Sequence, residues 1–418
     1  MRTPGRQHEL VARHARLRTP TAAGQLLKLI GIAVAVVLVS GIAVGVVLIG
    51  GLFTTVASNS VQIDGGKKLP PDIAAYKGGF DILLTGVDTC EPKYAALFGQ
   101  RCEGPDTDGI NNDVTLLMHV SAGPRRVTVI SFPRDMMMAI PACTDADGKT
   151  HAALRKAMLN VAYAHGGDKG GLNCVAKTVS SLLGGEDIEF AAKVTFGGVI
   201  EITNAIGGVD VCLQTPIIDR ETGLNLSAGH HTVEGLQALQ FLRTRHGVGD
   251  GSDLGRIGNQ QQYMSSLVRK LMSSQVLGNV GTVMKLADIG LSNVEASTSL
   301  ADPVKIAQIA LALKDVPVSD FTFVQYPVLD DPENANRVVP DEQNAAILWD
   351  AITANKQLQI THQNTKYDGV VVKEPAPGTS TAPTPDPSAT PGEVVDLPSS
   401  IKGTSAAVQT CSNGQTYR

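Results

Sequence analysis

Short apolar runs, each ended by turn-forming residues, recur along the chain and predict strands. Three of them lie close together, at residues 80–87, 114–121 and 127–132, and their β-branched and apolar content is typical of strands. Gly123-Pro124 separates the second run from the third, so we expect a tight reversal there and antiparallel pairing of these two strands. If the first strand runs alongside the third, the polar residues at the ends of the three strands share one edge of the sheet.

Helical spacing of apolar residues appears further along the chain. Within 169–183 apolar side chains recur at nearly helical spacing, at Leu172, Val175, Val179, Leu182 and Leu183. We predict a second helix at 199–206, ended by two glycines ahead of a short strand at 209–213, and a helical turn or two at 234–239 leading into 241–245. Strands that alternate with helices, with antiparallel elements among them, predict an α/β fold built on a layered sheet.

An uncharged apolar stretch at 29–53 precedes all of these elements. As a helix it would be about 37 Å long, enough to cross a bilayer with some tilt. A cleavable signal peptide is the alternative, but its apolar core normally spans about 7–15 residues. We therefore expect one transmembrane helix, and the basic flank before it places residues 1–28 in the cytoplasm and the rest outside the cell membrane.

The external part divides by composition. Residues 54–78 form a short polar stalk, and 79–365 mix apolar runs with Gly-rich turns over a length that suits one large domain. The remainder, 366–418, contains the Pro- and Ser/Thr-rich stretch 375–392, which cannot bury a core. We expect a linker there, followed by a tail too short to be a domain.

Charge is distributed unevenly along the chain. The 28 N-terminal residues carry a net charge of +5 and the whole chain −5, so the remainder carries −10. An acidic domain does not attract anions from a distance, so any anion site in it must be local and preorganised. No basic face or aromatic platform stands out in the sequence, so we expect no nucleic-acid partner.

Six cysteines fall in the part expected outside the cell, where disulfides persist. Six cysteines allow fifteen pairings, and spacing does not decide among them. We expect Cys90 to pair with Cys102, across the polar loop between two strands, and Cys143 with Cys174. Cys212 and Cys411 remain unassigned.

The segment 241–262 carries the most specific chemistry of the chain. Arg243, Arg245, Arg256 and Gln260 gather there around Gly-rich turns with few aliphatic residues. Two arginines spaced two apart share one face if the segment is extended. Asp253 is a good N-cap for a helix that would carry Arg256 in its first turn and Gln260 one turn later. Guanidinium groups beside a helix N-terminus favour a multiply charged phosphate, here a diphosphate, over the alternative of arginines on a solvated helix face.

Polar residues also meet at the ends of the three early strands. Asp88 follows the first strand, Asp113 precedes the second, and Arg134 and Asp135 follow the third. Each aspartate alone is more often a turn former or a cap. Two carboxylates and an arginine at one edge of a sheet are instead typical of a ligand site, because loops at strand ends carry binding residues.

The order of these motifs resembles the LytR–CpsA–Psr family of cell-envelope proteins. The resemblance covers about 80–270 and rests on ISFPRD, LNVAYAHGG, GGVDVCL, FLRTRHG and SDLGRIGNQQQ, of which PRD, the RxR pair and the DLGR block are together specific. It implies a three-layer α–β–α domain with a central mixed sheet. It also implies a phosphotransferase that takes a polyprenyl-diphosphate-linked glycan from the membrane and transfers the glycan phosphate to a peptidoglycan hydroxyl, with Mg²⁺ as cofactor.

The resemblance assigns roles to particular positions. Those matching the family's diphosphate ligands are Arg134, Arg243, Arg245, Arg256 and Gln260. Asp88 and Asp113 match the carboxylates associated with metal binding and catalysis, with Arg134 beside them. Mg²⁺ prefers one or two carboxylates together with phosphate oxygens and water, which fits a pair of aspartates.

The sequence also departs from the family pattern. Met158 stands where the family usually has lysine, and Arg155 and Lys156 just upstream are candidate replacements. Asn259 stands where a second arginine is common, which would loosen the hold on phosphate. Thr89 and Cys90 follow Asp88 where many members have an arginine.

Two alternatives to the enzyme differ in what they require of the chain. A lipid-carrier scaffold would bind the polyprenyl diphosphate without turnover, but binding alone would be improved by removing Asp88 and Asp113. A transcription regulator would need a DNA-binding domain, and the expected cytoplasmic tail is too short for a helix-turn-helix.

Overall fold

The computed structural model describes residues 60–64, 76–98, 102, 110–145, 147–167, 169–273, 286, 290, 293–362, 364–373 and 394–415. All of them belong to one unit, 52–418. The expected cytoplasmic tail and transmembrane helix, most of the stalk and the Pro-rich stretch 375–392 lie outside the described residues. Within the described residues, no helix is both long and apolar enough to span a membrane.

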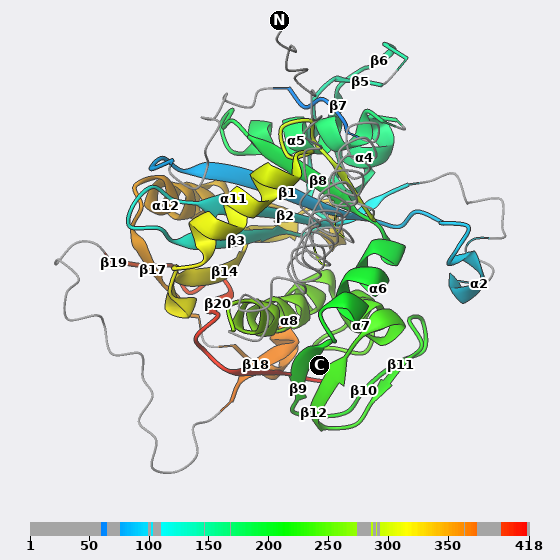
Figure 1. Cartoon of the computed structure of the whole chain (residues 1–418), viewed down its shortest axis with the longest axis vertical. Coiled ribbons are helices and arrows are strands. Elements are labelled where there is room, and N and C mark those ends of the chain that lie inside the picture. The colour runs from blue at the N-terminus through cyan, green and yellow to red at the C-terminus, as the bar shows by residue number, and fades with distance from the viewer. Residues whose placement is uncertain are drawn as a thin grey trace, which may run out of the picture. The chain divides into compact units, whose positions relative to one another are not determined.

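A seven-stranded sheet forms the centre of this unit (Figure 1). Its strand order is β13 (Val294–Ala296), β8 (Phe190–Val194), β1 (Phe80–Val87), β2 (Asn112–Val120), β3 (Val127–Phe132), β14 (Phe321–Gln325) and β20 (Gly403–Ser405). The β1–β8 and β3–β14 pairs are parallel, and the other pairs are antiparallel. The sheet is therefore mixed, as expected.

Helices cover both faces of the sheet. Successive side chains of each strand point to opposite faces, so apolar residues of the same strand pack into two separate cores. Leu83, Leu117 and Ile130 pack on one face against α5 (Gly171–Leu182) and α12 (Glu342–Thr353). Ile82 and Val129 pack on the other against α8 (Asp253–Leu271) and α11 (Pro303–Leu313). Figure 1 shows α5 and α8 on opposite sides of the strands. The arrangement is the expected three-layer one.

A smaller sheet lies beside α8, in the order β12 (Gly229–Val233), β9 (Val209–Leu213), β21 (Thr410–Ser412) and β18 (Val370–Val372). The short helix α2 (Ala95–Phe98) and the helices α6 (Phe196–Ala205) and α7 (Gly235–Arg243) complete this side of the unit. The other helices with described bounds are α4 (Ala162–His165) and the 3₁₀ turns Leu159–Val161, Val318–Asp320 and Lys366–Asp368.

The other strands form two-stranded pairs. They are β10 (Ile217–Asp219) with β11 (Leu224–Leu226), β15 (Val328–Asp331) with β16 (Asn334–Pro340), β4 (Met137–Ile140) with β7 (Leu154–Met158), β5 (Cys143–Thr144) with β6 (Thr150–His151), and β17 (Gln357–Gln359) with β19 (Val394–Asp396).

The chain after the Pro-rich stretch differs from the tail that we expected. Strand β20 pairs with β14 at the edge of the central sheet, and β21 pairs with β18 and β9 in the smaller one. A disulfide between Cys212 in β9 and Cys411 in β21 joins this segment to residues 199 positions earlier. The last described residues therefore contribute strands to both sheets. The other two disulfides join Cys90 to Cys102 and Cys143 to Cys174, the pairings expected from the sequence.

One strand neighbour was predicted wrongly. Strand β1 pairs with β2 and β8, not with β3, because β2 lies between β1 and β3 and is antiparallel to both. The end of β1, the start of β2 and the end of β3 still share one edge of the sheet. The predicted meeting of Asp88, Asp113 and Arg134 at that edge thus arises from a different strand order.

Candidate functional site

A cavity of about 770 Å³ lies between the central sheet and the helices α6, α7 and α8. Most of its wall is aliphatic, with Leu84, Leu116 and Val129 from the sheet, Val199 and Ile202 from α6, Leu236 and Leu239 from α7, and Met264 and Leu267 from α8. Asp113, Arg134, Arg243, Arg245, Arg256 and Gln260 also line it. The cavity therefore joins an apolar interior to a group of guanidinium side chains.

A break in the sheet register places Asp113. Gly86 pairs with Val114 and Val87 with Asn112, so Asp113 is the extra residue of a bulge between them. Bulges re-aim a side chain relative to its strand. The Asp113 Oδ1 accepts a hydrogen bond of 2.8 Å from Arg134 Nη1.

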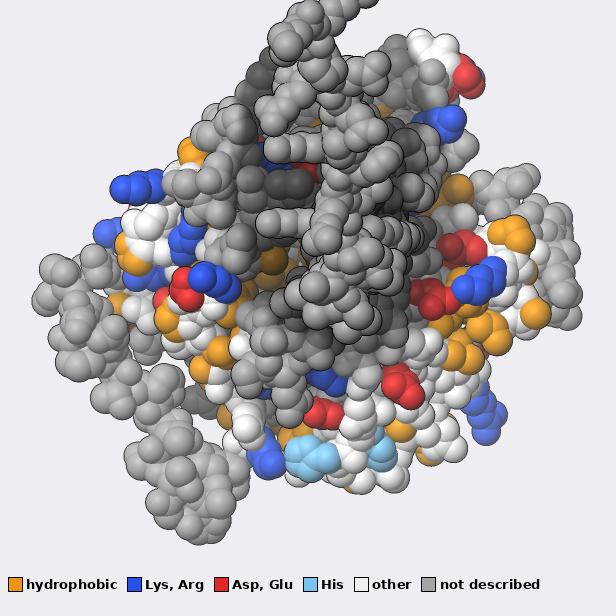
Figure 2. Space-filling model, in the orientation of Figure 1, with side chains coloured by type: hydrophobic (Ala, Val, Ile, Leu, Met, Phe, Trp, Pro, Cys, Tyr) orange, Lys and Arg blue, Asp and Glu red, His pale blue; other side chains and the backbone are white. Residues whose placement is uncertain are grey.

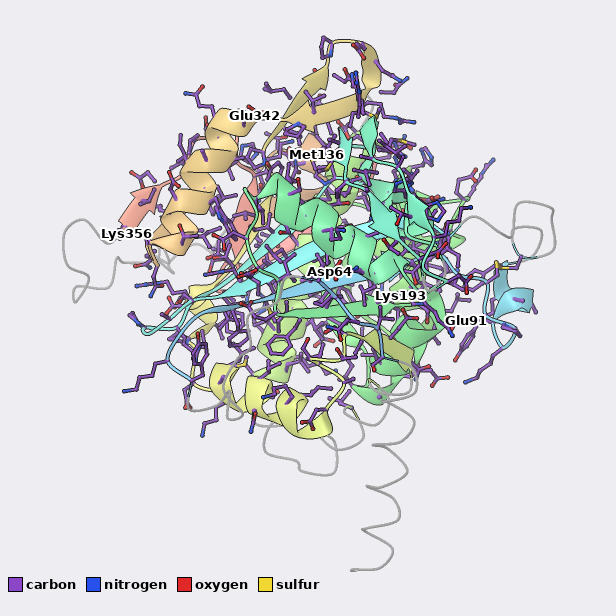
Figure 3. The ribbon with its side chains drawn as sticks, turned by 90° about the horizontal axis from the view of Figure 1, so that it is seen from above. Asp64, Glu91, Met136, Lys193, Glu342 and Lys356 are labelled. Carbon is purple, nitrogen blue, oxygen red and sulfur yellow. A yellow bond between two sulfur atoms is a disulfide. The ribbon has the colours of Figure 1, made fainter. Side chains whose placement is uncertain are left out.

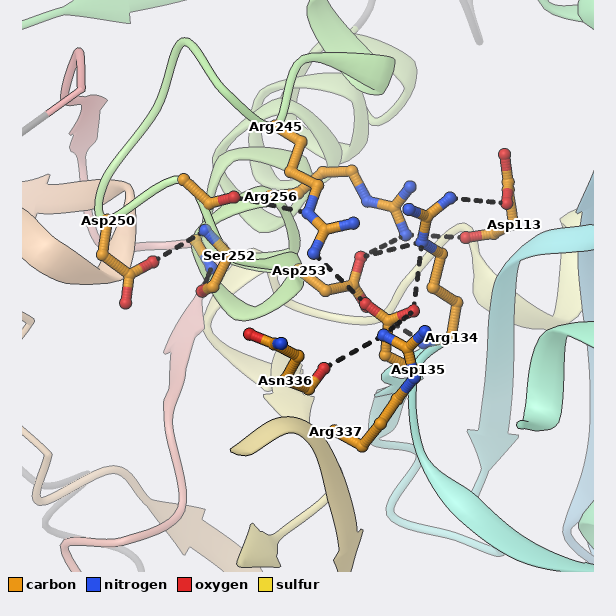
Figure 4. Close-up of polar contacts among 12 residues, drawn as sticks. Asp113, Arg134, Asp135, Arg245, Asp250, Ser252, Asp253, Arg256, Asn336 and Arg337 are labelled. Carbon is orange, nitrogen blue, oxygen red and sulfur yellow. Dashed lines mark hydrogen bonds and ion pairs between the residues drawn. The ribbon is translucent and has the colours of Figure 1, made fainter. Parts of the chain in front are cut away.

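Arg134 holds its position by contacts to three carboxylates (Figure 4). Besides Asp113, its Nε lies 3.7 Å from Asp253 and 3.8 Å from Asp135, and its backbone N–H donates to Asp253 Oδ2 over 3.0 Å. Burial lowers the pKa of the Arg134 guanidinium, but the carboxylates of Asp113, Asp253 and Asp135 outweigh burial and raise it. The group is charged and fixed before any ligand arrives.

Arg256 is the most buried guanidinium of the cluster. Its Nη2 lies 2.6 Å from Asp253 Oδ1, and the two side chains are only 6% and 5% exposed. The same Nη2 donates to the backbone carbonyl of Asp113 over 2.7 Å. Helix α8 begins at Asp253, and its N-cap is Ser252, whose side chain accepts from the Gly255 N–H. Asp253 was therefore wrongly predicted as the cap: it is the first helical residue and binds two arginines instead.

Arg245 lies in the loop between α7 and α8, and Asp219 holds that loop. The Asp219 carboxylate is buried and accepts from the Thr244 hydroxyl and from the backbone N–H groups of Arg245 and Gly247, over 2.6, 3.1 and 3.3 Å. Burial raises the pKa of Asp219, but hydrogen bonds from the Thr244 hydroxyl and from the backbone N–H groups of Arg245, Thr222 and Glu221 outweigh burial and lower that pKa. The Nη2 of Arg245 lies 3.3 Å from Asp135 Oδ2, so this arginine joins the same network.

Arg243 is held differently from the other arginines. It ends α7, because Thr244 leaves the helical conformation, so Arg243 and Arg245 do not share an extended strand. The Arg243 guanidinium lies 4.3 Å from the ring centre of Phe196 and 5.9 Å from that of Phe98. A guanidinium group in this position is attracted to the faces of the aromatic rings, and the contact stabilises its placement. Phe98 belongs to α2, whose loop is closed by the Cys90–Cys102 disulfide.

Other predicted residues lie outside the cavity. Asp88 Oδ1 accepts from the Asn111 N–H over 2.9 Å, at the sheet edge, and Asp88 is not among the cavity-lining residues. Lys156 pairs with Asp331 at 3.0 Å and with Glu333 at 2.5 Å, and Arg155 is exposed on β7. Neither Arg155 nor Lys156 lines the cavity. Neither of them therefore supplies a cation there in place of the lysine that the family usually has at the position of Met158.

The amides of α8 serve the packing of α7. Asn259 donates to the Phe241 carbonyl over 2.7 Å, and Gln260 donates to the Leu242 carbonyl over 2.9 Å. Asn259 is fully buried, so it cannot act as the exposed phosphate ligand that arginine would be at that position. Gln260 does both: it ties α8 to α7 and lines the cavity.

A metal site built by protein groups alone is not evident. No group of three or more His, Cys, Asp or Glu side chains within the described residues could hold a metal ion. Two carboxylates suffice for Mg²⁺ only when the ligand supplies phosphate oxygens. Asp88 and Asp113 flank the same strand edge and fit that demand, although Arg134 already pairs with Asp113.

Three residues that build the site were not predicted in these roles. Asp219 accepts hydrogen bonds from residues 25 or more positions away, Arg337 reaches Asp135 from the distant β15–β16 hairpin at 3.6 Å, and Asp253 was predicted only as a helix cap. A cavity with apolar walls and fixed guanidinium groups suits a lipid that carries an anionic head group.

Comparison with known proteins gives the family and the fold. The sequence model of the LytR_cpsA_psr family matches residues 47–354. The cell wall biosynthesis protein LcpA of Corynebacterium glutamicum is 29% identical over 288 residues, 65% of this chain and 54% of that protein. The polyisoprenyl-teichoic acid–peptidoglycan teichoic acid transferase TagT of Bacillus subtilis is 25% identical over 256 residues, 60% of this chain and 70% of that protein.

The fold is also similar to a solved structure. Protein gbs0355 of Streptococcus agalactiae matches with a TM-score of 0.53 at 20% identity, over 69% of this chain and 91% of that chain. The match to LcpA spans about half of that protein's length.

Proposed function

We propose that this chain, which belongs to the LytR_cpsA_psr family, transfers a glycan phosphate from a polyprenyl-diphosphate-linked glycopolymer to a hydroxyl of peptidoglycan. One observation carries the proposal: an aliphatic cavity of about 770 Å³ is lined at the same time by four arginines and by Asp113. The name of TagT, a polyisoprenyl-teichoic acid–peptidoglycan teichoic acid transferase, agrees with it.

The proposed donor fits the two parts of the cavity separately. The polyprenyl chain would lie against the aliphatic side chains of the sheet and of α6, α7 and α8, and burial of each CH₂ group would contribute about 0.8 kcal/mol. The diphosphate would lie against Arg134, Arg245 and Arg256. Guanidinium groups neutralise the oxygens of a phosphate in displacement and so stabilise its transition state.

In the proposed reaction, the Asp113 carboxylate would interact first with Arg134 and then with the incoming hydroxyl. With no ligand it accepts from Arg134. When a diphosphate takes up the Arg134 N–H groups, the Asp113 carboxylate becomes available for the proton of the incoming hydroxyl. We assign the role of general base to Asp113 or to Asp88, which follows β1 at the same edge.

Mg²⁺ belongs to this proposal. Asp88 and Asp113 would hold it together with diphosphate oxygens and water. Bound there, the ion would neutralise charge on the phosphate oxygens. The arginines would still orient the diphosphate, and the apolar wall would still exclude water from the lipid end.

The membrane anchor at 29–53 completes the arrangement that we propose, because the donor lipid resides in the membrane. The protein would be single-pass, with the N-terminus in the cytoplasm and the domain outside. Protease added to intact spheroplasts should then remove the part after residue 53; full protection, or release of a soluble form cut near Ala57, would contradict the topology.

The test of the activity uses the full-length protein in detergent with Mg²⁺, a short-chain polyprenyl-diphosphate sugar and peptidoglycan fragments. Mass spectrometry should find the phosphodiester product. Tight binding of the lipid with no product would instead make the protein a lipid-carrier scaffold.

A further inference from the structure

A fifth guanidinium group, Arg337, lies next to the cluster of Arg134, Arg243, Arg245 and Arg256, but on a separate hairpin. The Nη1 of Arg337 is 3.6 Å from Asp135 Oδ1, while Arg245 Nη2 is 3.3 Å from Asp135 Oδ2. The Nε of Arg134 lies 3.8 Å from the same carboxylate. One buried aspartate therefore faces three guanidinium groups (Figure 4).

The β15–β16 hairpin fixes the place of Arg337. Val338, the next residue, makes a bridge to Met136, the residue after Asp135. Figure 3 shows Met136 near the base of this hairpin. At the other end of the hairpin, Lys156 of β7 pairs with Asp331 and Glu333. Arg337 directly precedes Val338, which pairs with Asp330 within the hairpin as well as with Met136, and these pairs hold the backbone next to Arg337.

Arg337 and Arg245 remain open to water, unlike Arg256. Their side chains are 30% and 29% exposed, against 6% for Arg256. At 3.3–3.8 Å the three contacts to Asp135 are ion pairs longer than ordinary hydrogen bonds. Four guanidinium groups of the network face three carboxylates, Asp113, Asp135 and Asp253, so one positive charge is left over.

The geometry points to a second anion subsite, formed by Arg337 and Arg245 with Asp135 at its base. Arg337 does not line the lipid-sized cavity, whereas Arg245 does. The subsite therefore continues from the diphosphate position towards water. On the face shown in Figure 2, Lys and Arg side chains of the described residues lie beside Asp and Glu side chains.

The ligand of this subsite follows from its position, and this step rests on the proposed function. With the lipid in the cavity and the diphosphate at Arg134 and Arg256, only the water-facing part of the substrates reaches Arg337. The group bound there is an oxyanion, a phosphate or a carboxylate, which accepts two parallel N–H bonds from a guanidinium. It comes either from the glycan of the donor or from the peptide of the acceptor.

Binding measurements distinguish the two sources. Calorimetry would use the full-length protein in detergent with four probes: a polyprenyl-diphosphate disaccharide, the same lipid with added polyol-phosphate units, a peptidoglycan fragment with free carboxylates, and that fragment with its carboxylates amidated. The variants are Arg337→Ala and Arg337→Lys. Arg220→Ala is the matched control, because Arg220 is exposed in the β10–β11 turn and makes no ion pair with a described residue.

Arg337→Ala should weaken binding of one charged probe by about tenfold, and Arg337→Lys should restore part of that loss. A loss with the polyol-phosphate lipid but not with the disaccharide lipid assigns the anion to the donor. A loss with the free-carboxylate fragment but not with the amidated one assigns it to the acceptor. Added salt should reduce the difference between parent and variant, because exposed charges are screened.

Three results would overturn the subsite. They are equal affinity of parent and Arg337→Ala for all four probes, equal losses within both pairs of probes with and without the added phosphates or free carboxylates, and no binding to the parent of either the polyol-phosphate lipid or the free-carboxylate fragment. The proposed function fails separately: a parent that binds these probes but forms no phosphodiester is not the transferase, and the subsite is still decided by the affinities.

Discussion

Replacing Arg256 with alanine should destabilise the domain, whereas replacing Arg245 should weaken ligand binding and leave the domain folded. The structure makes this distinction. Arg256 and Asp253 form an ion pair of 2.6 Å whose side chains are 6% and 5% exposed. Arg245 pairs with Asp135 at 3.3 Å, and its side chain is 29% exposed.

The magnitudes follow from burial. Removing one partner of a buried pair costs up to about 3–5 kcal/mol, and after Arg256→Ala the Asp253 carboxylate keeps only the longer ion pair to Arg134, at 3.7 Å. Arg256→Ala removes in addition the donor to the Asp113 carbonyl. The longer ion pair of Arg245, whose side chain is partly exposed, contributes about 1 kcal/mol to stability. Its charged hydrogen bonds to a diphosphate are worth about 1.5–3 kcal/mol, which corresponds to a loss of roughly 10- to 150-fold in affinity.

Two assays separate the effects. Urea unfolding followed by circular dichroism measures the free energy of unfolding, and calorimetry with a short-chain polyprenyl diphosphate measures affinity. Arg220→Ala is again the control, with parental values expected in both. Unchanged unfolding of Arg256→Ala would show that the buried pair is not formed. Unchanged affinity of Arg245→Ala would refute the diphosphate site.

Three further outcomes are expected. In EDTA, Asp113→Asn should bind the diphosphate lipid at least as well as the parent, because a carboxylate that repels the ligand is gone. With Mg²⁺ it should turn over about 10²–10⁴ times more slowly if Asp113 is the base. Turnover at the parental rate, measured by mass spectrometry, would show that Asp113 is not the base. Replacing both Cys212 and Cys411 with alanine should lower the free energy of unfolding by about 3–5 kcal/mol, because their bond closes a long loop in the unfolded chain; an unchanged urea midpoint would show that the bond is absent. The hydrogen bond from His362 to Asp368 raises the pKa of His362 above 6.5. The stabilisation of the fold by protonated His362 is therefore complete below pH 6.5 and is lost as pH rises through the raised pKa. The difference in free energy of unfolding between parent and His362→Gln, followed by urea unfolding from about pH 5 to about pH 9, should shrink as pH rises, and a constant difference would contradict the assignment.

Local patterns predicted three strands of the central sheet, β1, β2 and β3, and one strand of the smaller sheet, β9. The bounds of β1, β3 and β9 are those expected from short apolar runs ended by turns. Helix α6 begins three residues earlier than predicted, at Phe196, because the Thr195 side chain caps it by accepting from the Gly198 N–H. Such corrections arise where a polar side chain decides an end that apolar spacing leaves open.

Long-range contacts set what the sequence could not indicate. The strand order depends on β8 and β14, which join the early strands in parallel from positions far along the chain. Strands β20 and β21 are three residues each, too short for a periodic signal. The role of Asp219 could not be predicted either, because it consists of hydrogen bonds to a loop 25 or more residues further along the chain.

The arginines of the site could be predicted, but their differences could not. A run such as RTR or DLGR shows that guanidinium groups gather, and it does not show which of them are buried. Burial separates Arg256 from Arg245, and aromatic contact separates Arg243 from both. The place of Arg337 beside the other arginines became apparent only from the geometry of the hairpin, because no sequence motif marks this residue.

The aspartates explain how an acidic domain can hold this cluster. The guanidinium groups of Arg134, Arg245, Arg256 and Arg337 would repel one another. Asp113, Asp135 and Asp253 compensate all but one of these four positive charges before a ligand arrives. In the proposed complex a diphosphate would displace carboxylates instead of ordering loose side chains, and preorganised donors of this kind need little rearrangement during reaction. At Arg134 the diphosphate would take the contact that Asp113 now makes. Binding of the donor would thus release a carboxylate beside the phosphorus at the moment when a hydroxyl needs a base.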